Sequence, residues 1–136
     1  MRTHHLFISH SWSYSSQYKN LMNLLGQRPY FSFKDFSVPR DDPIHDAVTS
    51  AELRRAIRAK MSPCGVVLIL AGVYASYSKW INEEIDLAKR DFLQPKPVIA
   101  IKPYGSTRMS VRVQEAADRI VGWNTESVVS AIRELS

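Results

Sequence analysis

Glu84 and the residues around it form the pattern in this chain that best suits catalysis. The segment Ser78–Asp86 has the sequence SKWINEEID, and on a helix its Trp80 and Glu84 lie four residues apart on one face. The neighbouring apolar stripe predicts that Glu84 borders the buried side of this helix, close to its first turns. A carboxylate that is partly desolvated there, beside an indole, would favour a positive charge developing nearby.

Glu83 is the alternative carboxylate in the same segment. It lies about 100° further round the helix, where we expect it to be solvated. The pattern alone also fits a simpler interpretation of either glutamate, as an acid at a helix start that complements the helix dipole. Without further information, it favours that interpretation.

Polar and aromatic side chains follow the first two predicted strands. Ser9, His10, Ser11 and Trp12 supply hydroxyl, imidazole and indole groups, which can hydrogen-bond a ribose or a phosphate and stack on a base. Asp35, with other acids and aromatic rings near it, would form a second side of a cleft. Both segments also fit an ordinary turn or structured loop without a ligand.

Several kinds of site are disfavoured by the sequence. It contains neither GxGxxG nor GxxxxGK[ST], which argues against the common dinucleotide dehydrogenases and P-loop enzymes. The first loop lacks the acidic pair with which receiver domains hold magnesium. The four histidines and Cys64 have no metal-ligand spacing, so no metal site is expected.

Strand and helix patterns alternate about five times along the chain. This alternation predicts a single α/β domain over residues 1–136, a flavodoxin-like three-layer sandwich with a mainly parallel sheet of about five strands. In such folds ligands bind beyond the carboxyl ends of the strands, where the loops described above begin. The expected strands are 5–8, 30–36, 65–70, 98–101 and 119–122, and the expected helices are 15–26, 50–61 (with Ser50 as its cap), 76–91, 111–117 and 125–135.

Composition limits the expected partners and compartment. The net charge is +5, but the basic residues are spread over predicted helix faces, where we expect them to be solvated, so nucleic acid is not an expected partner. The longest apolar run, Val66–Val73, is too short to span a bilayer and no secretion leader is recognised, so no membrane is expected. Cys64 is the only cysteine and is expected to pack in the core. The absence of an internal disulfide favours a cytoplasmic location.

Two motifs in the chain resemble those of TIR domains. Residues 6–11, LFISHS, resemble the opening strand and loop of the family, and residues 78–85 are similar to its S-x-W-x-x-x-E-[LI] segment, in which the glutamate cleaves NAD. Alignment on Trp80 gives that role to Glu84. The resemblance covers essentially the whole chain. It is greatest to the TIR-like branch that includes the ThsB proteins of bacterial Thoeris anti-phage defence, through FISHSW at 7–12 and VGWN at 121–124.

The resemblance implies an NAD glycohydrolase or ADP-ribosyl cyclase-like enzyme that makes a cyclic or conjugated ADP-ribose signal. NAD is then the substrate, and no metal takes part. Self-association through TIR surfaces is also implied, as is a separate effector protein that senses the product. Glu84 would be the catalytic residue, and Phe7, Ser9, His10, Ser11, Trp12, Asp35 and Trp80 would bind NAD.

Three other functions stay open at this stage. A non-catalytic TIR adaptor would use the same surfaces for assembly and would not depend on Glu84. A nucleoside deoxyribosyltransferase-like enzyme has a related α/β architecture and also places a glutamate at an anomeric carbon. A nucleic-acid-binding module rests on net charge alone and is the weakest. The chain departs from the TIR pattern at Ile81, where a cysteine is usual, and it keeps only part of the R-D-x-x-P-G loop, at Arg40–Pro43.

The segment Ser37–Pro43 is predicted to lie beside the cleft, where it either covers the substrate or bridges to a neighbouring subunit, and we favour the second role. Its two prolines restrict its conformations, its charges make it unsuited to burial against its own core, and TIR enzymes resembling this chain use that loop for assembly. If association favours the loop state that opens the site, NAD cleavage per subunit should rise with protein concentration. A dilution series measures this rise, and Arg40→Ala or Asp42→Ala should flatten it. Constant specific activity in a monomeric protein would contradict the prediction.

Overall fold

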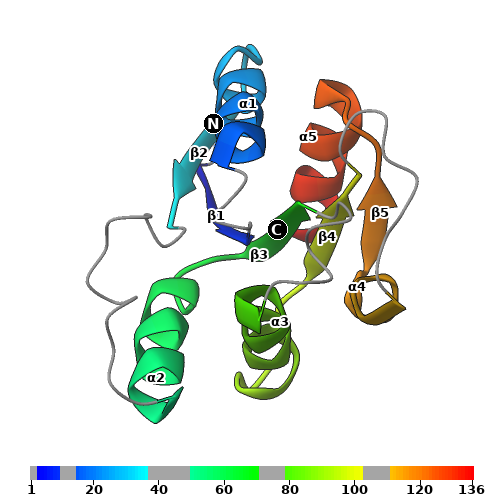
Figure 1. The fold of residues 1–136 in the computed structure, drawn as a ribbon. Coiled ribbons are helices and arrows are strands. Elements are labelled where there is room, and N and C mark those ends of the chain that lie inside the picture. The colour runs from blue at the N-terminus through cyan, green and yellow to red at the C-terminus, as the bar shows by residue number, and fades with distance from the viewer. Residues whose placement is uncertain (1–2, 10–14, 37–49, 71–78, 103–110) are drawn as a thin grey trace.

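The computed structural model describes residues 3–9, 15–36, 50–70, 79–102 and 111–136 of the chain. Within these ranges strands and helices alternate from one end to the other (Figure 1). The strands are β1 (Thr3–Ser9), β2 (Ser32–Asp35), β3 (Val66–Leu70), β4 (Val98–Ile101) and β5 (Arg119–Val121). The helices are α1 (Ser15–Gly26), α2 (Ser50–Met61), α3 (Lys79–Arg90), α4 (Val111–Ala116) and α5 (Thr125–Leu135).

The five strands form one sheet in the order β2-β1-β3-β4-β5, and every pairing between neighbours is parallel. Parallel neighbours need a crossover between them, and the helices supply it. The predicted flavodoxin-like α/β fold is therefore confirmed. The apolar strand Val66–Leu70 lies at the centre of the sheet, and all five of its residues are buried.

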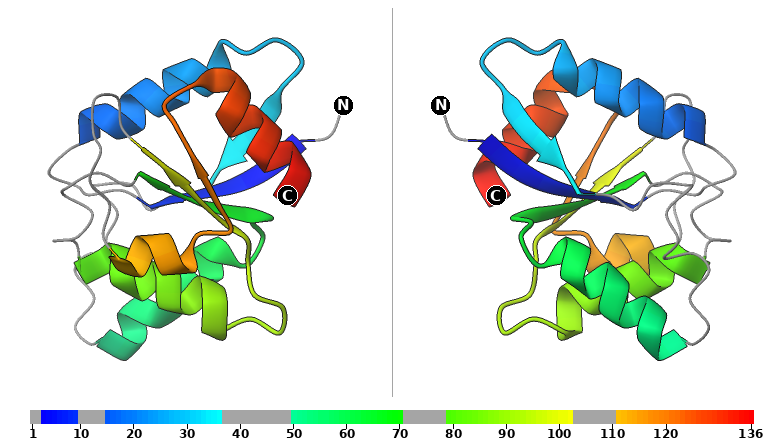
Figure 2. Two further views of the ribbon diagram at one scale, coloured as in Figure 1. Left: turned by 90° about the vertical axis from the view of Figure 1, so that its right-hand side faces the viewer. Right: turned by 90° about the vertical axis from the view of Figure 1, so that its left-hand side faces the viewer.

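The helices cover both faces of the sheet, α1 and α5 one face and α2, α3 and α4 the other (Figure 2). The chain steps from β1 outward to β2 and then back past β1 to β3. Because crossovers between parallel strands are right-handed, this reversal places α1 and α2 on opposite faces. The helices that follow β1 and β3, α1 and α3, therefore lie on opposite faces, which makes the carboxyl ends of these two strands the topological switch point.

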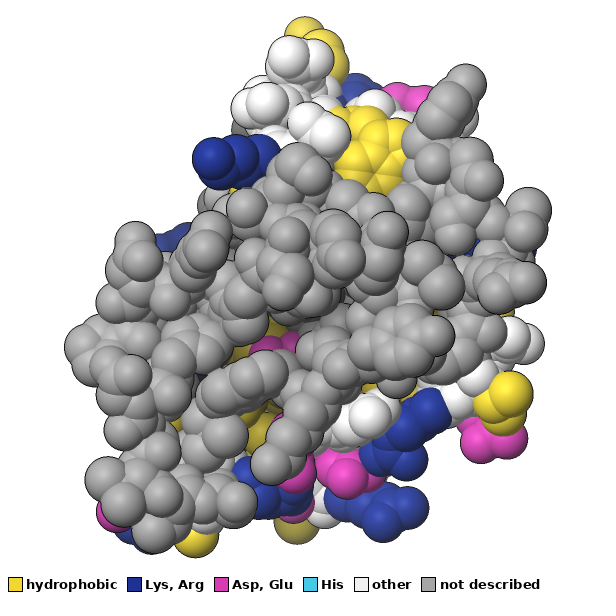
Figure 3. Space-filling model, viewed as in Figure 1, with side chains coloured by type: hydrophobic (Ala, Val, Ile, Leu, Met, Phe, Trp, Pro, Cys, Tyr) yellow, Lys and Arg dark blue, Asp and Glu magenta, His cyan; other side chains and the backbone are white. Residues whose placement is uncertain are grey.

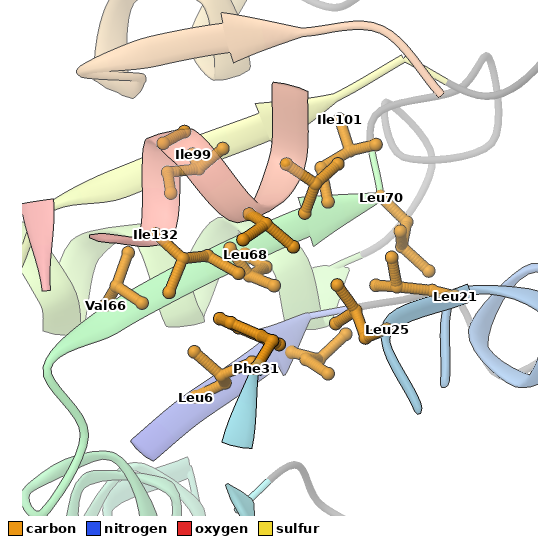
Figure 4. Close-up of a cluster of buried hydrophobic side chains, with 14 residues drawn as sticks. Leu6, Leu21, Leu25, Phe31, Val66, Leu68, Leu70, Ile99, Ile101 and Ile132 are labelled. Atoms are coloured by element: carbon orange, nitrogen blue, oxygen red, sulfur yellow. The ribbon is translucent and has the colours of Figure 1, made fainter. Parts of the chain in front are cut away.

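Alternation along the strands divides the core into two layers. Leu6 and Ile8 of β1 face α1 and α5, whereas Phe7 faces the other three helices. Figure 4 shows the first of these layers, in which side chains from β1, β3 and β4 meet those of α1 and α5. Burial of apolar side chains on both faces is the main source of stability for such a sheet.

The second strand differs from its predicted bounds of 30–36. Tyr30 has φ of 60° and a side chain that is 84% exposed, so it belongs to the turn after α1. A left-handed residue cannot continue an extended strand, and β2 begins only at Ser32. Ser50, predicted to cap the second helix, is instead the first residue of α2. None of the helices in the described part of the chain combines the length and apolar character needed to cross a bilayer.

The start of α5 offers a test of the local structure. Asn124 caps this helix, and its side-chain oxygen accepts a hydrogen bond of 3.2 Å from the backbone N–H of Ser127. We expect Asn124→Ala to lower the free energy of unfolding by about 1 kcal/mol, because that N–H loses its partner. Urea unfolding measures the change. Asn124→Asp should retain most of the stability, and Ser130→Ala in the same helix should lower it little or not at all.

Candidate functional site

Glu84 occupies the buried side of α3, near the switch point. The helix follows the central strand, so its first turn lies at the carboxyl edge of the sheet, and it contacts β1, α2 and α4. Glu84 comes five residues after the start, about 8 Å along the axis. Its side chain is only 7% exposed, its Oε2 atom is buried, and the apolar residues that follow it belong to the core. A buried carboxylate thus stands in the first half of the helix that leaves the carboxyl edge of the sheet.

Glu83 has different surroundings from its neighbour. Its carboxylate forms an ion pair with Arg54 of α2, and its side chain is 29% exposed. The hydrogen bond that Arg54 donates to Glu83 raises the pKa of its guanidinium above the usual value, against the opposing effect of lost hydration. Glu83 is the more exposed of the two glutamates, as predicted, but it is bound to a neighbouring helix rather than simply solvated.

Two further ion pairs involve the outer side of α3. Asp86 pairs with Arg112 of α4, and Lys89 donates to Asp118 at 2.5 Å. Burial raises the pKa of Asp118, but the hydrogen bonds from Lys89 and the backbone N–H of Val98 outweigh it and leave the pKa below its usual value. These pairs are partly exposed, so each contributes at most about 1 kcal/mol to the free energy of unfolding. Together they tie α3 to α4 and to the segment before β5.

Acidic and basic side chains stand side by side over α2 and α3 in the space-filling view (Figure 3). The sequence-based interpretation of the basic residues as solvated helix charges missed the contacts of Arg54 and Arg112. The available signal was the opposite charge at Glu83 and Asp86. It becomes informative only when the order of the helices on the sheet is known.

Phe7 lies within the core beneath α3. Its side chain is fully buried in the cluster that also contains Ile85. A ring without exposed surface packs against its neighbours and offers no face on which a base can stack. The structure therefore gives Phe7 the role of holding β1 against the helix that carries Glu84.

Asp35 is separated from the end of β1. The sheet register places Asp35 beside Leu6 and Ser9 beside Ile69. Three residues of strand, about 10 Å, therefore lie between the level of Asp35 and that of Ser9. Paired residues of parallel strands point to the same face, so Asp35 is on the side of Leu6, facing α1 and α5, whereas Glu84 is on the other side. The structure does not bring Asp35 and Glu84 together.

The other predicted binding residues lie at the carboxyl edge or beyond the described ranges. Ser9 ends β1 at that edge, and Trp80 is the second residue of α3; the positions of their side chains are not described. His10, Ser11, Trp12, Arg40 and Asp42 fall outside the described residues. What the structure shows is thus that β1 ends and α3 begins at the same edge of the sheet, with Glu84 buried in the first half of that helix.

Histidine contacts in the structure are with neighbouring protein groups. His4 hydrogen-bonds the hydroxyl of Ser136 at 2.9 Å and stacks on Phe31, and His5 hydrogen-bonds the carbonyl of Pro63 at 3.2 Å. Among the described residues, no three His, Cys, Asp or Glu side chains are grouped in a way that would hold a metal ion.

Comparison with known protein families gives a match over most of the chain. The family model described as Thoeris protein ThsB, TIR-like domain, matches residues 7–108. That range includes the end of β1 and the whole of α3, with Glu84. No curated protein matches the chain.

The burial of Cys64 can be tested through the reactivity of its thiol. It is 3% exposed, as expected for a core residue, and burial raises the pKa of its thiol to about 12. A thiol with this pKa is almost wholly protonated at pH 8, and the thiolate is the reactive form. We therefore expect alkylation by iodoacetamide at pH 8 to be at least about a hundredfold slower in the folded protein than in urea, as mass spectrometry would measure. Similar rates in the two states would contradict the buried position.

Proposed function

The chain belongs to the family of Thoeris ThsB TIR-like domains, and from this premise we propose that it cleaves the nicotinamide–ribose bond of NAD with Glu84 as the catalytic carboxylate. The observation that carries the proposal is the burial of Glu84 on α3 beside the switch point. Acidic side chains are rarely buried to this degree without a compensating role. Its neighbour Glu83 already serves in an ion pair with Arg54 and is the weaker candidate.

The reaction needs a fixed negative charge more than it needs an acid. The bond between the anomeric carbon and the nicotinamide nitrogen breaks, its electron pair leaves with nicotinamide, and positive charge moves onto the ribose. A carboxylate held beside the anomeric carbon stabilises this oxocarbenium-like state, and more strongly in a partly buried position than in water. An oxygen nucleophile then bonds to the anomeric carbon and loses its proton to solvent.

The binding of NAD falls to the residues at the carboxyl edge. In this proposal Ser9, His10, Ser11 and Trp12 contact the ribose, the phosphates and a base, and Trp80 stands one helical turn before Glu84. The burial of Phe7 and the separation of Asp35 give these two residues supporting positions instead. No metal takes part in the proposed reaction.

The choice of nucleophile decides the product. Water would give ADP-ribose, whereas a group of the same molecule or of a second molecule would give a cyclic or conjugated ADP-ribose. We propose that the cyclic or conjugated product serves as a signal in anti-phage defence, that a separate effector protein senses it, and that the chain self-associates to become active. The family membership supports these steps.

Glu84→Gln tests the proposal directly. The substitution preserves the shape of the side chain and removes its charge, so we expect nicotinamide release from NAD to fall by about a hundredfold or more. The melting temperature should change little, because the buried group becomes neutral and keeps its volume. Nicotinamide is measured by chromatography, at high protein concentration and with a crowding agent, because the enzyme is expected to need assembly.

Two comparisons make the result specific to position 84. Glu83→Gln should lose much less activity than Glu84→Gln, and Glu115→Gln on the exposed side of α4 should behave like the unmodified protein. Full activity of Glu84→Gln together with a large loss in Glu83→Gln would assign the reaction to the other glutamate. Release of free base from deoxynucleosides, without cleavage of NAD, would identify a deoxyribosyltransferase instead.

A further inference from the structure

Two ion pairs join the outer face of α3, near Glu84, to the two helices α2 and α4. Glu83, one residue before it, pairs with Arg54 of α2, and Asp86, two residues after it, pairs with Arg112 of α4. Around the helix these two acids lie about 100° and 160° from Glu84. Both therefore project from the outer side of α3, while Glu84 projects from the buried side.

The apolar contacts of α3 anchor the part of the helix that follows Glu84. Ile85, Leu87 and Ala88, which come after Glu84, are buried in the core. Glu83, which comes before it, pairs with Arg54 of α2. Around Glu84 the helix is thus held both by apolar burial and by an ion pair.

Arg54 is itself held in a definite position. Besides Glu83, its guanidinium contacts the carboxylate of Asp91 at 3.4 Å, immediately after the end of α3. The two acids lie eight residues apart, so one arginine contacts both the first half of α3 and the residue that follows its last turn. The planar guanidinium can bind two carboxylates with separate nitrogens, which a lysine ammonium does with less geometric control.

We infer that Arg54 and Arg112 are positioning residues for Glu84. By binding two acids on the outer face of α3 from the two helices that it contacts, α2 and α4, they set the rotation of α3 about its axis and thereby the direction of the Glu84 carboxylate. This inference rests on the proposed function of Glu84, and neither arginine touches the substrate. A displacement of a catalytic group by as little as 1 Å can lower a rate by about a hundredfold, so a modest rotation has a measurable effect.

Kinetics of arginine variants provide the first test. Arg54→Gln and Arg112→Gln should each lower kcat for nicotinamide release by about fivefold, equivalent to about 1 kcal/mol, with KM for NAD changed by less than about twofold. The double variant Arg54→Gln/Glu83→Gln should be no slower than Arg54→Gln alone, because Arg54→Gln already breaks the pair with Glu83. Arg54→Lys should retain most of the rate, since it keeps the charge.

Arg119→Gln is the matched control. It breaks the ion pair between Arg119 of β5 and Glu134 of α5, which is more exposed and does not involve α3. Its kcat should equal that of the unmodified protein. If Arg119→Gln slows the reaction as much as Arg54→Gln, the effect is one of general stability and the inference is wrong.

A second readout is independent of catalysis. With ¹³C-labelled glutamate, the carboxyl resonance of Glu84 can be assigned by its loss in Glu84→Gln. It should move in Arg54→Gln and Arg112→Gln and stay in place in Arg119→Gln. Movement of the resonance in a protein that does not release nicotinamide would support the positioning role and refute the proposed function. Release of nicotinamide with neither kcat nor the resonance altered in the arginine variants would refute the positioning role alone.

Discussion

The rest of the structure depends on a strand that must be shielded from water on both faces. All five residues of β3 are apolar and buried, so the sheet needs helices above and below it. The hand of the crossovers then places α1 and α5 on one face and α2, α3 and α4 on the other. The placement of α1 and α3 on opposite faces follows from this burial, and so does the position of Glu84 on α3.

In the layer formed by α2, α3 and α4, apolar burial and ion pairs have different effects on α3. Apolar burial holds α3 on the sheet and supplies most of the energy, at about 25 cal/mol for each Å² removed from water. Ion pairs such as Arg54–Glu83 contribute little to stability because they are partly exposed. They are directional, however, whereas hydrophobic contacts are not. A helix can therefore be kept in place by one force and oriented by the other.

The sequence predicts the parts of this fold that depend on local pattern. The apolar runs at β3 and β4, and the bounds of α1 and α5, follow from periodicity and end signals alone. The start of β2 does not, because the left-handed conformation of Tyr30 is set by how the turn packs and not by a residue type that favours it. Local pattern finds elements more reliably than it finds the ends of short edge strands.

The site was predictable to a smaller extent. The burial of Glu84 follows from its place on an amphipathic helix, and its proposed role comes from a resemblance between motifs. The distance between Asp35 and Ser9 depends on strand register, which two separate segments fix only when they pair. The partner of Glu83 depends in the same way on which helix lies beside α3. Contacts between segments that are far apart in the sequence cannot be predicted from the pattern within each segment.

The parallel order of the sheet also affects how the chain folds during its synthesis. Leu6 of β1 pairs with Val66 of β3, which the ribosome adds 60 residues later. At a synthesis rate of about 5–20 residues per second, the first strand waits roughly 3–12 s for its central neighbour. During that time its apolar residues and one backbone edge lack their final cover, and long-range strand pairing is slow in any case. Nascent chains of this fold thus pass through an interval in which chaperones have a clear target.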